Sequence, residues 1–294
     1  MKHSKFNSMS RREMMALSAR AAVGAATLAT GVSTALSQGQ RRFRIGACDW
    51  SIGKMGDPGA FAVAKKIGLD GVQVSLGTAQ NDMRLRQAAV QDEYKAAAKK
   101  VGLEVSSLAI GELNSIPYKS DPRTVEWVSG SIDACRALGV RVVLLAFFGN
   151  DDLIGDKAGT DEVVKRLKAV APKAEQAGVI LGIESWLSAD QHIDILDRVG
   201  SDAVKVYYDC CNSHDKGYDI YQEIRKLGKR ICEFHAKENG KLLGQGGVDF
   251  KKVRLAMDDI GYSGWIQIEG AVPPGKPMLE SYQANCAFMR GIFS

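Results

Sequence analysis

The sequence has 294 residues and a formal net charge of +5. Five basic residues against one glutamate give residues 1–37 most of this charge, so the remaining chain is nearly neutral. A near-neutral body excludes the basic surface with which nucleic-acid-binding domains neutralise phosphates. Its length, roughly 255 residues, fits one large α/β domain better than two small ones.

Residues 1–37 have the features of an export signal. Two adjacent arginines, Arg11 and Arg12, precede an Ala-rich, weakly apolar stretch that ends in a small-x-small cleavage site at residues 35–37. This order predicts a twin-arginine signal peptide, read by the twin-arginine export machinery and leading to the periplasm. Arg20 and two glycines interrupt the stretch, so stable membrane insertion is not expected. The alternative is a disordered basic N-terminus that is never cleaved.

After Arg44, eight short apolar runs alternate with amphipathic stretches of helical period. Each run is rich in Val, Ile or aromatic residues, as buried parallel strands are. The predicted strands are residues 44–51, 71–77, 104–113, 141–148, 179–185, 204–210, 231–238 and 264–271.

The stretches between the strands have helical periodicity, and seven of them end in a glycine suited to a left-handed C-cap. Eight strand–helix units predict a single-domain (β/α)8 TIM barrel over residues 42–294. A doubly wound open sheet is the runner-up, but residues 47–51 do not form its Gly-rich phosphate turn. The predicted helices are residues 57–67, 84–101, 121–138, 161–177, 189–199, 220–227, 250–260 and about 278–293.

Four successive predicted strands each end in a carboxylate or an imidazole: Glu184, Asp209, His235 and Glu269. The carboxyl ends of barrel strands face the active site, so these side chains are expected to converge there. Three converging carboxylates repel one another, and a divalent cation removes that repulsion. One imidazole with three carboxylates suits Mn²⁺, Mg²⁺, Co²⁺ or Fe²⁺ better than a thiolate-preferring metal. The alternative is four independent surface or loop charges.

The residues around these strand ends resemble those of the sugar phosphate isomerase/epimerase family. This group of xylose isomerase-like barrels (AP endonuclease family 2) also contains ketose 3-epimerases, inosose dehydratases and endonuclease IV. The resemblance is strongest after residue 179 and is carried by residues 183–184, 207–209, 212, 234–238, 243–246 and 264–269. It departs from the family pattern at Cys210 and Cys211, which we expect to be packing residues on the sixth strand.

The resemblance implies one divalent metal ion, with Mn²⁺ the first expectation, held by Glu184, Asp209, His235 and Glu269. It also implies that Glu184 and Glu269 are the acid/base pair of an epimerase. A metal that polarises a carbonyl stabilises the enediolate formed when the neighbouring carbon loses its proton. One carboxylate would remove that proton and the other would return it on the opposite face.

Six further residues are candidates for contacts with a sugar substrate. Each has a plainer alternative: a solvated histidine or lysine, a loop acid, or an aromatic residue of the core. His192 lies inside a predicted helix and is interpreted as a surface residue. The six candidates are Asn212, His214, Lys237, Glu112, Trp50 and Trp186.

The predicted function is therefore a metal-dependent isomerase or epimerase of a keto sugar. A lyase or hydratase acting on a keto sugar of the 3-keto-glycoside type would use the same site. A nuclease of the endonuclease IV type needs more imidazoles than the three histidines after residue 37 supply. A non-catalytic sugar-binding protein would not need the carboxylate cluster. Export favours an unphosphorylated sugar, and the sequence leaves the oligomeric state open.

Overall fold

The computed structural model describes residues 42–294, and the predicted signal peptide lies outside the described residues. Eight parallel strands pair in chain order and close into a barrel, with β1 pairing with β8. This confirms the predicted TIM barrel over the doubly wound sheet. The strands are β1 (Phe43–Cys48), β2 (Gly71–Ser75), β3 (Glu104–Ile110), β4 (Val142–Phe147), β5 (Ile180–Ser185), β6 (Val204–Asp209), β7 (Ile231–Lys237) and β8 (Gly264–Glu269).

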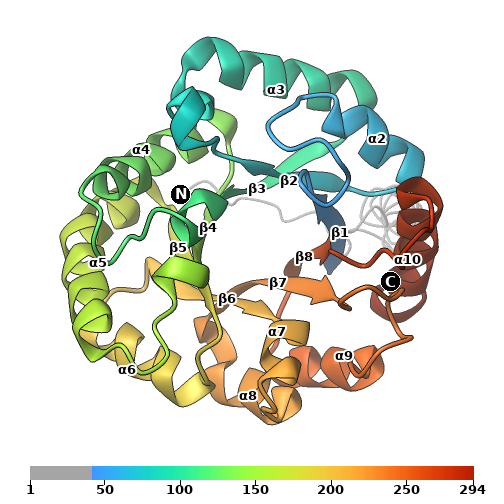
Figure 1. Ribbon diagram of the computed structural model, residues 1–294. Coiled ribbons are helices and arrows are strands. Elements are labelled where there is room, and N and C mark those ends of the chain that lie inside the picture. The colour runs from blue at the N-terminus through green and yellow to red at the C-terminus, as the bar shows by residue number, and fades with distance from the viewer. Residues whose placement is uncertain (1–41) are drawn as a thin grey trace, which may run out of the picture. The chain divides into compact units, whose positions relative to one another are not determined.

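The helices surround the strands as an outer ring (Figure 1). Their apolar faces pack on the barrel, and the strands, covered on both sides, are almost wholly buried. Most helices end at a glycine with positive φ, such as Gly102 (φ 68°). The helices are α2 (Ala60–Ile67), α3 (Ala88–Val101), α4 (Arg123–Leu138), α5 (Lys157–Ala177), α6 (Ala189–Val199), α7 (Cys210–Asp215), α8 (Ile220–Leu227), α9 (Phe250–Asp259) and α10 (Met278–Phe293).

The strand register brings the chemistry-bearing residues to one end of the barrel. Asp209 on β6 pairs with His235 on β7, and Lys237 on β7 pairs with Glu269 on β8. Glu184 is the next-to-last residue of β5. Since neighbouring parallel strands are about 4.8 Å apart, residues in register at their carboxyl ends face a common space.

The prediction that Cys210 and Cys211 lie on the sixth strand is wrong. Both residues begin the short helix α7, which the apolar pattern did not reveal, and neither lies on β6. The cause is Asp209, whose Oδ1 accepts hydrogen bonds from the backbone N–H groups of Cys211 and Asn212 at 2.8 Å. This capping starts a helix directly after the strand.

The interpretation of His192 as a surface residue is also wrong. Its helix, α6, forms as predicted, but the side chain is only 3% exposed and points inward. His192 Nε2 lies 2.9 Å from Ser185 Oγ, and Nδ1 lies 3.1 Å from the carbonyl oxygen of Ser188. Both ring nitrogens therefore have partners inside the β5–α6 turn, so burial of the neutral imidazole leaves none of its polar atoms unsatisfied.

This burial predicts a stability that depends on pH. Burial lowers the pKa of His192 to about 4, against an ordinary value of 6.5. The contribution of His192 to the free energy of unfolding is complete above pH 6.5 and is lost as the pH falls toward 4. In this range the unfolded chain binds a proton at His192 and the folded chain does not. Between pH 7 and pH 5 the loss is about 2 kcal/mol. Urea unfolding of wild type and His192→Gln at both pH values measures this difference.

The matched control is His214→Gln, because His214 is 42% exposed along its side chain. We expect this variant to retain the pH dependence of the wild type. If the free energy of unfolding fell by the same amount between pH 7 and pH 5 in wild type and in His192→Gln, the assignment of this loss to His192 would be contradicted.

Among the described residues, no helix is long and apolar enough to cross a membrane.

Candidate metal centre

The four residues predicted as metal ligands converge at the mouth of the barrel. Glu184, Asp209, His235 and Glu269 each present one ligand atom, and these four atoms all lie within 4.8 Å of one another. The first three side chains are buried, and the Glu269 side chain is 15% exposed. Four donors at this separation, drawn from four neighbouring strands, form a compact shell around one point.

His235 presents its Nδ1 atom to the three carboxylates. Nδ1 lies 2.9 Å from Glu184 Oε1, 3.6 Å from Glu269 Oε2 and 3.8 Å from Asp209 Oδ2. Burial lowers the pKa of His235, but Cys48 and the carboxylates of Glu184 and Glu269 together outweigh it and raise the pKa well above the ordinary value. A ring nitrogen this basic is a strong donor once its proton is exchanged for a cation.

Asp209 has one satisfied and one unsatisfied oxygen. Oδ1 caps α7, whereas Oδ2 is buried and makes no hydrogen bond, its nearest cation being Lys237 Nζ at 3.7 Å. Burial, opposed by Lys237, raises the pKa of Asp209 to about 7. A buried carboxylate oxygen without a partner costs free energy, and a bound cation would remove that cost.

Glu269 is held from two sides. Trp50 Nε1 donates a hydrogen bond to Oε1 at 2.9 Å, and Lys237 Nζ lies 2.9 Å from Oε2. Burial alone would raise the pKa of Glu269, but His235 and Lys237 outweigh it and lower the pKa to about 2. The carboxylate therefore stays ionised at any physiological pH.

The charges of these residues fit a divalent cation. Three carboxylates and the Lys237 ammonium sum to two negative charges when His235 is neutral, and a divalent ion brings the cluster to zero. The donor set, three carboxylates with one imidazole, suits Mn²⁺, Mg²⁺, Co²⁺ or Fe²⁺. On this structure Glu184, Asp209, His235 and Glu269 are the residues that would hold the ion.

A cavity of about 450 Å³ opens above the cluster. This volume lies within the range of small-molecule sites. Among its lining residues are five of the six predicted substrate contacts: Trp50, Glu112, Trp186, Asn212 and Lys237.

One wall of the cavity is apolar and aromatic. Phe148 and Trp186 pack edge to face with ring centroids 5.2 Å apart, and both line the cavity with Trp50. Glu112 lies in a 3₁₀ turn after β3, where its Oε1 accepts a hydrogen bond from the Ala79 N–H. The cavity thus combines flat apolar surface with a few polar groups, which suits a sugar ring.

The structure does not bring His214 to the cavity. It lies near the end of α7, where Nδ1 is 3.4 Å from Asp215 Oδ1, and it does not line the cavity. Asn212, two residues earlier, does line it and also donates its N–H to Asp209.

Sequence reasoning missed a buried polar network beneath the metal ligands. Gln73 Oε1 lies 2.9 Å from His235 Nε2, and Gln73 Nε2 donates to the Tyr207 hydroxyl at 3.1 Å. Tyr207 donates to Glu233 Oε1 at 3.0 Å. Burial raises the pKa of Glu233 to about 7 against the hydrogen bonds that stabilise its charge. The available signal was the alternation of polar Glu233, His235 and Lys237 along β7 and the single polar side chain within Val72–Val74.

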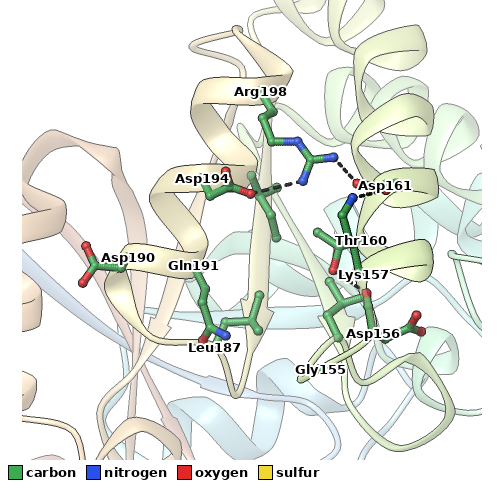
Figure 2. A pocket seen from close by; sticks show the side chains of 12 residues that line it. Gly155, Asp156, Lys157, Thr160, Asp161, Leu187, Asp190, Gln191, Asp194 and Arg198 are labelled. Atoms are coloured by element: carbon green, nitrogen blue, oxygen red, sulfur yellow. Dashed lines mark hydrogen bonds and ion pairs between the residues drawn. The ribbon is translucent and has the colours of Figure 1, made fainter.

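A larger hollow of about 750 Å³ lies elsewhere, between α5 and α6 (Figure 2). None of the predicted site residues lines it. Asp161 pairs with both Lys157 and Arg198, and Arg198 also pairs with Asp194 (Figure 2). The two remaining carboxylates of the hollow, Asp156 and Asp190, pair with Lys119 and Lys226 outside it. The chemistry therefore belongs to the barrel mouth and not to this hollow.

A family model described as xylose isomerase-like TIM barrel matches residues 61–292. The chain belongs to this family, in agreement with the resemblance found in its sequence.

Curated relatives include proteins named as 3-epimerases. A D-psicose 3-epimerase of Enterocloster bolteae is 29% identical over 135 residues, 43% of this chain and 44% of that protein. A putative L-ribulose-5-phosphate 3-epimerase of Escherichia coli is 24% identical over 261 residues, 78% of this chain and 88% of that protein. Probable endonuclease 4 of Thermotoga petrophila is 28% identical over 143 residues, 45% of this chain and 50% of that protein. The chain spans about half to two thirds of the length of the first curated relatives that it matches.

Solved structures share the fold. D-psicose 3-epimerase from Clostridium cellulolyticum superimposes with a TM-score of 0.73 at 20% identity, over 85% of this chain and 99% of that chain. At this identity the similarity establishes the barrel.

Proposed function

We propose that the protein is a metal-dependent epimerase or isomerase of a keto sugar. The observation that carries this proposal is the cluster of Glu184, Asp209, His235 and Glu269, whose ligand atoms lie within 4.8 Å of one another. Glu184 and Glu269 also line the 450 Å³ cavity. The names of the relatives, D-psicose and L-ribulose-5-phosphate 3-epimerases, support the same reaction class.

Glu184 and Glu269 are the proposed acid/base pair. They come from β5 and β8, with Asp209 and His235 between them along the rim, and both line the cavity. A carboxylate on one face of the sugar removes the proton next to the carbonyl, and the carboxylate on the other face returns it. A bound divalent ion would supply stabilisation of negative charge on the substrate oxygens.

Lys237 and Asn212 have supporting roles in this scheme. The Lys237 ammonium lies 2.9 Å from Glu269 and lines the cavity, so it keeps that glutamate ionised as a base. Asn212 donates its backbone N–H to Asp209 Oδ1, and this contact holds the carboxylate so that Oδ2 is left for the metal. Trp50 donates to the other oxygen of Glu269 and fixes the plane of its carboxylate.

The proposed substrate is unphosphorylated. Lys237 is the single Lys or Arg among the residues that line the cavity, and Glu269 and Asp209 already engage it. A phosphate would meet Glu112 and the ligand carboxylates, and no Lys or Arg among the lining residues is free of a carboxylate partner to bind it. This proposal also agrees with the predicted export, in which a chain folded and loaded with metal would meet free sugars.

A lyase or hydratase acting on a keto sugar of the 3-keto-glycoside type remains the second candidate. Loss of a group beta to the enediolate would give elimination in place of reprotonation, with the same base and the same cluster. The packed pair of Phe148 and Trp186 supports this candidate, because a glycoside's second group needs apolar surface beside the sugar ring.

The test is incubation of Mn²⁺-loaded protein with keto sugars and 3-keto glycosides in D₂O. We expect one deuterium at the carbon next to the carbonyl together with the inverted epimer, both read by NMR. An unsaturated product would favour the lyase. No exchange with any keto sugar would contradict both.

A further inference from the structure

The buried hydrogen-bond network beneath the four proposed metal ligands has a defined order of donors and acceptors, which can be followed from its deepest residue toward His235. It begins at Glu233, a fully buried residue of β7. Glu233 Oε1 accepts hydrogen bonds from Gln267 Nε2 at 2.6 Å, Ser107 Oγ at 2.8 Å and the Tyr207 hydroxyl at 3.0 Å. An oxygen that accepts three donors is an acceptor only, so the Tyr207 proton points down toward Glu233.

The direction continues through Gln73. Because the Tyr207 proton is used toward Glu233, its oxygen is left to accept, and it receives a hydrogen bond from Gln73 Nε2 at 3.1 Å. This contact identifies the amide atom that faces Tyr207 as the nitrogen of Gln73. The carbonyl oxygen Oε1 must then face the opposite way, toward His235 Nε2 at 2.9 Å.

The last link is His235. Gln73 Oε1 has no proton to give, so His235 Nε2 must carry the proton of that contact. The Cys48 thiol donates to the same oxygen at 3.2 Å, which fills its second lone pair. With the proton held on Nε2, a neutral His235 has its free lone pair on Nδ1, the atom that faces Glu184, Asp209 and Glu269.

We propose that Gln73 is a positioning residue of the metal centre and that the chain Glu233–Tyr207–Gln73 holds His235 as the Nε2–H tautomer. The inference rests on the proposed function in one respect, the divalent ion bound at the cluster. Partners of this kind orient a ligating imidazole and increase its basicity.

Cys48 is the residue that would become the hydrogen-bond partner of His235 Nε2 if Gln73 were replaced. Its sulfur lies 3.4 Å from His235 Nε2. Without the amide oxygen, the thiol would donate to Nε2 and stabilise the opposite tautomer, whose Nδ1 proton points at the metal position. Loss of Gln73 would therefore oppose metal binding directly.

The test is the Mn²⁺ dissociation constant of substrate-free protein at pH 8, measured by titration calorimetry. Gln73→Met keeps the size of the side chain but removes the acceptor, and we expect affinity to fall about 10- to 100-fold. Gln73→Glu restores an acceptor toward Nε2 and should recover most of the wild-type affinity. Equal losses in both variants would overturn the proposal, because packing alone would then explain them.

A second pair of variants tests the lower part of the chain. Tyr207→Phe removes the one hydroxyl that orients Gln73, and we expect a loss of affinity smaller than that of Gln73→Met. Ser107→Ala removes another donor to Glu233 that lies off the path to His235, and it should bind like the wild type. Equal affinities for these two variants would overturn the chain, even if Gln73→Met failed to fold.

The outcomes separate this inference from the proposed function. Wild-type protein that binds no Mn²⁺ would overturn both. Wild-type binding that Gln73→Met leaves unchanged would overturn only the role of the chain.

Discussion

Glu184→Gln and Glu269→Gln are each expected to lower the interconversion of the two epimers by about 10²- to 10⁴-fold, the range for loss of one acid/base group. Glutamine keeps the shape of the side chain but cannot accept the proton. In the two-base scheme each carboxylate serves one face of the sugar. Each variant should therefore still exchange solvent deuterium with one epimer and not with the other.

Because both glutamates are also metal ligands in this account, the rates are measured at saturating Mn²⁺ with the metal content determined alongside. Glu223→Gln is the matched control: this half-buried glutamate bonds the Ala189 N–H and the Tyr208 hydroxyl, and it does not line the cavity. It should retain wild-type rates. Undiminished exchange of both epimers in both Glu184→Gln and Glu269→Gln would contradict the two-base scheme.

We expect removal of the metal by a chelator to abolish turnover and added Mn²⁺ to restore it, because the proposed enediolate would lose its main source of charge stabilisation. The same treatment lowers stability. A ligand present at 100 times its dissociation constant stabilises the folded state by about 2.7 kcal/mol. For a domain of this size that corresponds to a rise in Tm of roughly 5 to 10 °C.

Thermal unfolding with and without Mn²⁺ measures this shift. Asp209→Asn is the informative comparison, since the amide oxygen can still cap α7 while one charge of the cluster is gone. We expect a much smaller Mn²⁺-dependent rise in this variant. A rise as large as that of the wild type would place the ion elsewhere.

The barrel and its four strand-end residues could be predicted because their signals are local. An apolar run followed by a charged residue, as at Glu184 and Glu269, marks the end of a buried strand on its own. Repeated on successive strands, it specifies a shared mouth. Trp50, Glu112 and Trp186, which line the cavity, could be predicted for the same reason, since each directly follows or closely flanks a strand end.

What the sequence did not reveal depends on partners from distant strands. Gln73, Tyr207 and Glu233 come from β2, β6 and β7, and only the closed barrel makes them neighbours. His192 could have been found from spacing, because it stands in helical register with Ile195, Leu196 and Val199. The spacing does not show that Ser185 and Ser188 satisfy both of its nitrogens, which is what permits a polar ring on the buried face.

The most direct test of the metal centre is the metal content of the protein purified without chelator, measured by elemental analysis for wild type and for His235→Gln. The four-residue site predicts about one divalent ion per wild-type chain and a large loss in the variant, whose side chain cannot supply the Nδ1 donor. Wild-type protein without a stoichiometric metal, or a variant that retains it fully, would contradict the account.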